Sequence, residues 1–191
     1  MTEPVAPSDQ TLISQTLAGD RRAFTLLMGR HSADLYRFVA RRLRDPEESY
    51  DVVQETFVSA WRALRRYDPA RPFDIWLRAI AFNNCRDRGR KAAVRKVLRR
   101  LAPMGPEVET VPDSQPLADE QLEAKAAQRR FDAALAELPA HLRDTLTLTL
   151  WDGLSHGEVA ELLGINVKAV ENRLYRAKVL LSQALAEKAW T

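Results

Sequence analysis

A cluster of hydrogen-bond donors near the end of the chain has residue types and spacing that suit contacts with nucleic acid. Lys168, Asn172, Tyr175 and Arg176 would share one face of a helix, with Arg173 at its flank. Arg and Lys bind phosphates, and Arg and Asn also pair with the edges of bases. The chemistry predicted for this cluster is recognition of a nucleic acid.

The surrounding stretch, LSHGEVAELLGINVKAVENRLYRAKVLLSQAL, predicts the elements that position these donors. Ser155 and Glu158 are spaced as a capping box, so a short helix is expected from His156. Gly164 permits a sharp turn, and Asn166 is placed to cap a second helix. That helix has one apolar stripe, formed by Val170, Leu174, Ala177, Leu181 and Leu185. The pattern predicts a helix-turn-helix over 155–176, with an ordinary helical hairpin as the alternative.

A second candidate surface lies on a helix that should begin at Asp45-Pro46, a cap followed by a proline at the first helical position. One face of this helix is apolar, formed by Val53, Phe57, Ala60, Trp61 and Leu64. The other face shows Asp51, Gln54, Glu55, Val58 and Arg62. Because Trp61 belongs to the apolar stripe, it is interpreted as a core residue.

A third candidate surface follows the proline-containing loop 65–72. A helix beginning near Phe73 has an apolar start, with Phe73, Trp76, Leu77 and Ile80 packing inward. Its end is polar and basic, with Asn83, Asn84, Arg86, Asp87, Arg88, Arg90 and Lys91. Residues 71–100 hold ten Arg or Lys and two Asp, which indicates an anion-binding surface, with a merely solvated charge run as the alternative.

The pattern over the whole chain predicts an all-α protein with two small helical domains. The 191 residues are 46% hydrophobic, and period-two alternation is absent. The predicted domains are 9–91 and 124–188. The segment 92–123 is predicted to be a flexible linker because prolines and acids accumulate there. In the first domain, His31 lies on an apolar stripe and is interpreted as a residue at the edge of the core.

Composition argues against several other functions. The single cysteine, Cys85, excludes an internal disulfide, and His31, His141, His156 and Cys85 lack metal-ligand spacing. No metal, no cofactor and no enzymatic activity are therefore expected. Neither a signal peptide nor an apolar run approaching ~18 residues occurs, so we expect a cytoplasmic protein without membrane insertion.

Three blocks of the sequence resemble the bacterial sigma-70 family, specifically its extracytoplasmic-function (ECF) sigma factors. DVVQETFVSAW (51–61) looks like the segment of sigma domain 2 that docks on core RNA polymerase. FDIWLRAIAFNNCRDRGR (73–90) looks like the segment that melts and reads the −10 element. Residues 135–185, opening LAELPAHLRDTLTL, look like sigma domain 4, which reads the −35 element. The chain also resembles the sigma factor of a nickel–cobalt resistance system.

The resemblance implies three binding surfaces. Core RNA polymerase would contact Asp51, Gln54, Glu55, Val58 and Arg62. The −10 region of promoter DNA would contact Tyr67, Arg71, Asn83, Asn84, Arg86, Asp87, Arg88, Arg90 and Lys91. The −35 region would contact Lys168, Asn172, Arg173, Tyr175 and Arg176. The family often has a pair of small residues and a Lys early in the last helix. Lys168-Ala169 and Glu171 stand there instead, so the promoter sequence cannot be transferred from relatives.

The resemblance further implies control by an anti-sigma factor, often anchored in the membrane. Two alternatives stay open at the level of sequence. A free-standing helix-turn-helix regulator would not explain the block at 51–61. A pure protein-interaction module would not need the basic residues of 71–100.

Overall fold

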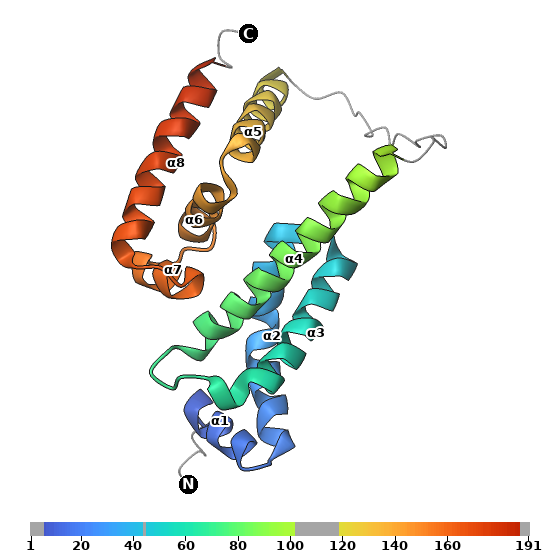
Figure 1. The fold of residues 1–191 in the computed structure, drawn as a ribbon, viewed down its shortest axis with the longest axis vertical. Coiled ribbons are helices and arrows are strands. Elements are labelled where there is room, and N and C mark those ends of the chain that lie inside the picture. Colours follow the sequence, from blue (N-terminus) through green and yellow to red (C-terminus); the bar gives the residue numbers. More distant parts are fainter. Residues whose placement is uncertain (1–5, 44, 102–118, 188–191) are drawn as a thin grey trace. The chain divides into compact units, whose positions relative to one another are not determined.

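The chain is helical throughout most of residues 6–43, 45–101 and 119–187, the parts described by the computed structural model (Figure 1). These parts contain no strand. They form two compact units, Met1–Met104 and Gly105–Thr191. The predicted all-α, two-domain fold is confirmed. The helices are α1 (Asp9–Leu17), α2 (Arg21–Leu43), α3 (Pro46–Ala63), the 3₁₀ turn η1 (Leu64–Arg66), α4 (Phe73–Leu101), α5 (Asp119–Glu137), α6 (Ala140–Leu150), α7 (His156–Leu163) and α8 (Val167–Glu187).

The first unit is a bundle of α2, α3 and α4, with α1 packed against α2 at one end (Figure 1). Its core is formed by side chains that are almost fully buried, including Leu27, Leu35, Phe38, Val52, Phe57, Ile75 and Leu77. Two of its helices, α2 and α3, begin at capping residues that the sequence supplies. The Asp45 side chain accepts from the backbone N–H of Glu48 (2.9 Å), and Asp20 accepts from that of Arg22 (2.9 Å).

His31 lies at the edge of this core, as predicted. Its Nε2 is 2.7 Å from Oδ2 of Asp9, and its ring meets the ring of Phe73 edge-on at 5.2 Å. Asp9 also accepts from Arg30. The contacts join α1 and α2 to the start of α4, so His31 has a structural role in this unit.

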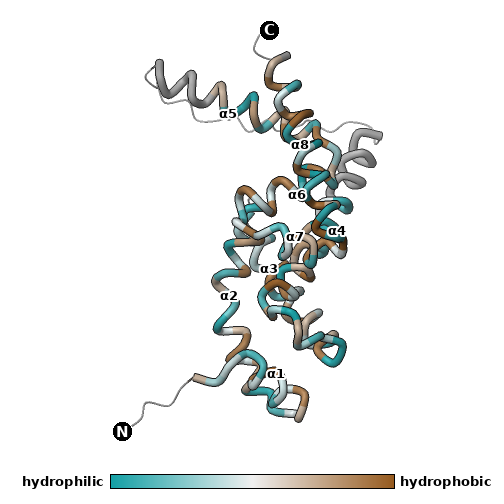
Figure 2. Tube along the Cα trace, turned by 90° about the vertical axis from the view of Figure 1, so that its left-hand side faces the viewer, coloured by the Kyte–Doolittle hydropathy of each residue, from teal (hydrophilic) through white to brown (hydrophobic). Residues whose placement is uncertain are grey.

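In the second unit, α8 packs against α5, α6 and α7. The buried residues include Leu142, Leu146, Leu148, Val159 and Val170. Figure 2 shows hydrophobic and hydrophilic residues interleaved along the helices, as expected for amphipathic helices with one buried face. Among the described residues, none of the helices has the length and apolar character needed to cross a membrane.

The predicted ends of two helices were wrong. Helical order was expected to stop near Lys91, but α4 continues to Leu101, and α5 begins at Asp119 rather than near Ala124. Residues 92–101 contain no proline or glycine and are rich in Ala, Leu, Lys and Arg, which favour helix. The prediction followed the prolines and acids further along the segment and overlooked this propensity. Residues 102–118, most of the predicted linker, lie outside the described residues.

Candidate nucleic-acid interfaces

The helix-turn-helix forms as its capping residues predict. The Ser155 side chain accepts from the backbone N–H of Glu158 (3.3 Å), and the Glu158 carboxylate accepts from that of Ser155 (2.8 Å). Gly164 ends α7 in the left-handed conformation, with φ 65° and ψ 37°. Asn166 then accepts from the backbone N–H of Ala169 (2.8 Å) and starts α8. Local chemistry therefore sets both helix ends at this turn.

The outer face of α8 carries the predicted donors. Lys168, Asn172, Tyr175 and Arg176 are exposed, and Arg173 is half-buried at the flank. Val170, Leu174 and Ala177 point into the core. Lys168 forms an ion pair with Glu171 (3.0 Å), which reduces the positive charge at the start of the helix. Arg176 thus presents an exposed charge beyond that pair, and Tyr175 is 71% exposed beside it.

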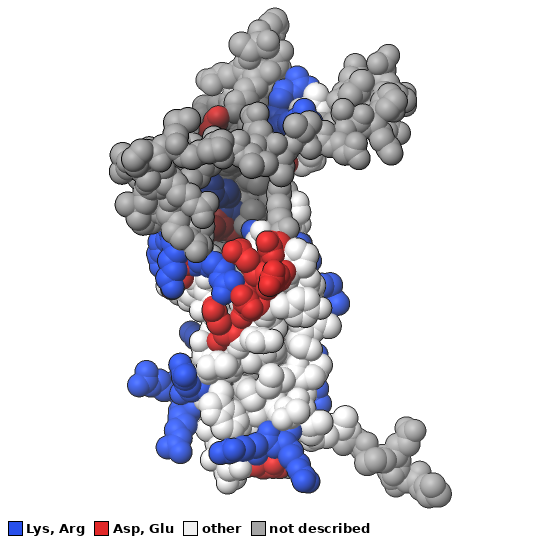
Figure 3. Space-filling model, turned by 90° about the vertical axis from the view of Figure 1, so that its right-hand side faces the viewer, with Lys and Arg blue, Asp and Glu red and all other residues white. Residues whose placement is uncertain are grey.

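The outer face of α3 is the second candidate surface. Asp51, Gln54, Glu55, Val58 and Arg62 are all exposed, whereas Val52, Val53, Phe57 and Ala60 are buried on the opposite side. Figure 3 shows acidic side chains gathered in a patch on the face of the first unit that α3 forms, with basic side chains along its border. Such a surface suits a basic protein partner better than DNA.

An apolar groove runs beside this acidic patch between α2 and α3. A hollow of about 600 Å³ is lined by Arg21, Phe24, Met28, Gln54, Phe57, Val58 and Trp61. Trp61 was predicted to lie in the core, but it is 42% exposed and packs edge-on against Phe24 at 4.9 Å. Helical periodicity placed it on the apolar stripe, yet it lies at the rim. Of the two apolar residues of α2 that line this hollow, Phe24 is buried, at 6% exposed, and Met28 is 37% exposed.

At the polar end of α4, two neighbouring asparagines lie in different environments. Asn83 is exposed, whereas Asn84 is half-buried and donates to Oγ1 of Thr56 on α3 (3.1 Å). Asn84 was predicted to contact DNA, but this bond gives it a role in the packing of α3 on α4. Arg86, Asp87, Arg90 and Lys91 are exposed. Asp87 and Arg90 form an ion pair within the helix.

Tyr67 does not face solvent as its predicted role in DNA binding requires. It is 8% exposed and packs against Trp76 and Phe73, with ring centroids 5.0 and 5.6 Å away. Its hydroxyl donates to the backbone carbonyl of Arg71. The loop position suggested exposure, but the aromatic cluster buries the ring. Tyr67 therefore shapes the loop 67–72, and Arg71 is exposed on it.

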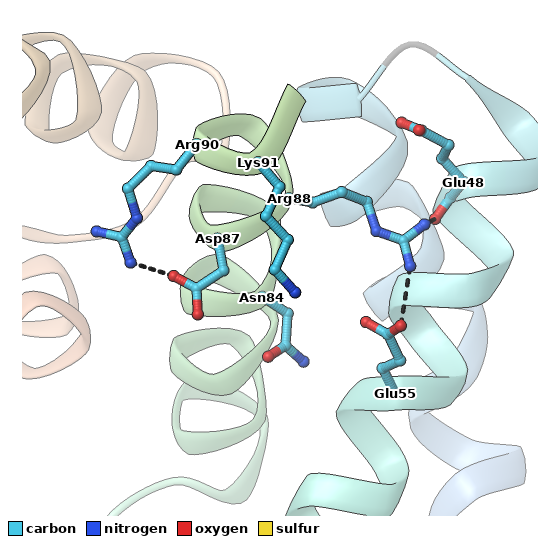
Figure 4. Close-up of a pocket in the computed structure, with 7 residues that line it drawn as sticks. All are labelled: Glu48, Glu55, Asn84, Asp87, Arg88, Arg90 and Lys91. Carbon is cyan, nitrogen blue, oxygen red and sulfur yellow. Dashed lines mark hydrogen bonds and ion pairs between the residues drawn. The ribbon is translucent and has the colours of Figure 1, made fainter. Parts of the chain in front are cut away.

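Arg88, which was predicted to contact the −10 region, makes its described contacts with α3. Its guanidinium donates to Glu55 (2.9 Å) and Asp51 (3.4 Å) of α3 (Figure 4, which draws the Glu55 contact). Partial burial lowers the pKa of Arg88, but the charges and hydrogen bonds of Glu55 and Asp51 outweigh this effect and raise it above its ordinary value. Its partners lie more than thirty residues away in the sequence, so periodicity could not reveal them.

The described residues show little sign of catalytic or metal chemistry. Within them, no three His, Cys, Asp or Glu side chains gather closely enough to hold a metal ion. Cys85 is buried, and burial raises the pKa of its thiol to about 11, although Arg42 and Arg88 oppose that shift. A protonated, buried thiol is a poor nucleophile.

The fold and these surfaces define a two-domain helical protein of the DNA-binding class, in which a helix-turn-helix unit accompanies a separate helical domain. Comparison with known families gives a narrower result. Residues 27–105 match Sigma-70 region 2, and residues 128–181 match Sigma-70 region 4.

Known relatives agree with this match over nearly the whole chain. RNA polymerase sigma factor CnrH of Cupriavidus metallidurans is 38% identical, over 93% of this chain and 94% of the relative. RNA polymerase sigma factor NccH of Alcaligenes xylosoxydans xylosoxydans is 33% identical over 97% of both chains. ECF RNA polymerase sigma factor SigM of Mycobacterium tuberculosis is 33% identical, over 93% of this chain and 85% of the relative.

A solved structure shows the same fold. CnrH in complex with the cytosolic domain of CnrY aligns with a TM-score of 0.60 and 32% identity, over 95% of this chain and 99% of that one. The chain belongs to the ECF group of the sigma-70 family of RNA polymerase sigma factors.

Proposed function

We propose that this sigma factor binds core RNA polymerase through the outer face of α3 and places its two domains on the −10 and −35 elements of a promoter. The observation that carries the proposal is the division of exposed surfaces within one chain. The α3 face is acidic and lies beside an apolar groove, as suits a protein partner. The α8 face is basic and lies in a helix-turn-helix, as suits the major groove of DNA.

On the DNA side, the exposed residues Arg71, Asn83, Arg86, Arg90 and Lys91 form the best-supported −10 surface. A single strand is bound by basic groups along its backbone and by pockets for its bases. We assign sequence reading at −35 to Asn172, Arg173 and Arg176, because their side chains can pair with base edges. Tyr67, Asn84 and Arg88 contribute indirectly. Tyr67 shapes the loop that carries Arg71, and Asn84 and Arg88 bond to α3.

We further propose that the chain works in the cytoplasm and is held inactive by an anti-sigma factor. The related CnrH has been solved bound to the cytosolic domain of CnrY, so a cytosolic segment can bind a chain of this fold. The acidic face of α3 and its apolar groove offer an amphipathic helix both charge and apolar contacts. Whether that partner is anchored in a membrane can be tested by pull-down from the membrane fraction of the same bacterium.

The decisive experiment is a gel shift on the DNA upstream of the chain's own gene, with and without core RNA polymerase from the same bacterium. A stable, specific complex should form only when core enzyme is present. Glu55→Lys should prevent the complex by weakening core binding. Arg176→Ala should lower promoter affinity roughly tenfold, since one good base contact is worth ~1–3 kcal/mol. Specific binding without core enzyme would instead identify a free-standing regulator.

A further inference from the structure

Arg88 connects the helix of the proposed DNA surface to the helix of the proposed docking surface. It extends from α4, and its guanidinium contacts Oε1 of Glu55 at 2.9 Å and Oδ2 of Asp51 at 3.4 Å. It also lies 3.5 Å from the backbone carbonyl of Glu48. Figure 4 shows Arg88 directed toward α3, whereas Arg90 is directed away from it. One side chain thus bridges two turns of α3.

The two carboxylates keep most of their surface while Arg88 loses its own. The Arg88 side chain is 20% exposed, compared with 62% for Asp51 and 58% for Glu55. A carboxylate has two oxygens and several lone pairs, so it can accept from Arg88 and from a second donor. Both side chains are therefore accessible to a basic partner while they accept from Arg88.

Arg90 provides a contrast on the same helix. Its side chain is 69% exposed, and its ion-pair partner, Asp87, belongs to α4 itself. Charge at Arg90 is thus presented to solvent, where a phosphate can approach. Charge at Arg88 is directed to the α3 carboxylates. The two arginines are close in sequence but serve different surfaces.

We propose that Arg88 is a positioning residue for polymerase docking, which holds the carboxylates of Asp51 and Glu55 in the orientation that a basic partner helix binds. The inference rests on the proposed docking role of α3 and deepens it. Two neighbouring carboxylates repel each other, and a planar guanidinium with several donors can hold both at once. Fixing them in advance lowers the ordering cost of association.

The test measures binding of core RNA polymerase to the full chain by stopped-flow fluorescence, at several salt concentrations. Arg88→Gln should weaken the complex about threefold to tenfold, a range consistent with coupled surface charges. Dissociation should become faster because the carboxylates are no longer held. Association should depend more steeply on salt, because two uncompensated negative charges then attract the basic partner. General destabilisation of the fold would not produce that salt effect.

Two further variants provide controls. Arg88→Lys retains the charge but not the two-pronged geometry, so its core affinity should fall between those of the original chain and Arg88→Gln. Arg90→Gln should weaken promoter binding and flatten its salt dependence without changing core affinity. In a Glu55→Gln background, Arg88→Gln should cause a smaller further loss than it does alone.

The binding data distinguish a failure of the Arg88 proposal from a failure of the α3 docking proposal. If Glu55→Gln weakens core binding while Arg88→Gln does not, Arg88 has no positioning role and the docking surface stands. If Arg88→Gln weakens DNA binding as Arg90→Gln does, with core affinity intact, Arg88 belongs to the DNA surface. If neither Asp51→Asn nor Glu55→Gln changes core affinity, the docking role of α3 fails, and the role of Arg88 fails with it.

Discussion

Two adjacent asparagines on α4 illustrate how one step along a helix changes a side chain's role. Asn83 is exposed, while Asn84 donates to Thr56 at the α3–α4 contact. Asn84→Ala should lower the free energy of unfolding by about 1 kcal/mol, the usual worth of one hydrogen bond. Asn83→Ala should change it by less than about 0.5 kcal/mol. Urea unfolding measures both.

For promoter opening, we expect Asn83 to be the more important of the two. Asn83→Ala should impair promoter opening more than core binding, because its side chain is available to the separated strand. Permanganate reactivity of thymines on a linear promoter, compared with a premelted one, reports this step. A defect in core binding alone would make Asn83 a structural residue.

Cys85 should be chemically inert in the folded protein. Burial raises the pKa of its thiol from 9.0 to about 11, so the reactive thiolate is scarce at pH 8. Iodoacetamide should modify Cys85 slowly in the native chain and quickly in urea. Mass spectrometry follows the reaction, and fast native labelling would show that the site opens.

The same shift affects stability at high pH. The folded state holds the thiol proton more tightly than the unfolded state, so the contribution is complete below about pH 9. It is lost as the pH rises from 9.0 toward about 11. The urea midpoint should fall across this window in the original chain. Cys85→Ala should reduce that fall, and an unchanged fall would assign it to other groups.

At the level of elements, the turn of the helix-turn-helix depends on one glycine. Gly164 has φ 65°, where a Cβ costs roughly 1–2 kcal/mol. Gly164→Ala should therefore destabilise the second unit by about that amount. Gly157→Ala is the matched control, because Gly157 is helical and its nearest atom, Oγ of Ser155, is at 3.9 Å. Equal urea midpoints for the two variants would contradict this account.

Elements set by local chemistry could be predicted from the sequence. Ser155, Glu158, Gly164 and Asn166 interact with backbone groups within a few residues, so their spacing was enough to place α7 and the start of α8. The start of α3 at Asp45-Pro46 followed for the same reason. At the end of α4 the prediction was wrong, because prolines and acids placed the start of the linker at residue 92 although residues 92–101 favour helix.

Contacts between elements could not be predicted in this way. The stripe containing Trp61 correctly identified the buried face of α3, but its rim depends on the position of α2. Tyr67 is buried by Trp76 and Phe73 across the loop, and Arg88 pairs with a helix over thirty residues earlier. The type of each residue predicted what it could bind. Which element its side chain contacts depends on how separate helices pack, and the sequence pattern does not show this.

At the level of the whole molecule, each unit has its own core. Leu77 is buried in the first unit and Leu146 in the second, each 1% exposed. We expect calorimetry to resolve separate unfolding transitions for the two units. Leu146→Ala should lower only the transition of the second unit, with a cost of ~2–5 kcal/mol. Equal shifts of both transitions would show that the units unfold together.

The continuity of α4 has a consequence for insertions and deletions. One helix carries Asn83, exposed on one side, and Arg88, directed toward α3. Each residue turns a helix by about 100°, so one residue inserted between them would rotate one side chain away from its surface. Changes of length inside this part of α4 should therefore be rejected during evolution even where the inserted residue favours helix. Substitutions that keep the number of residues between Asn83 and Arg88 leave both side chains directed at their own surfaces.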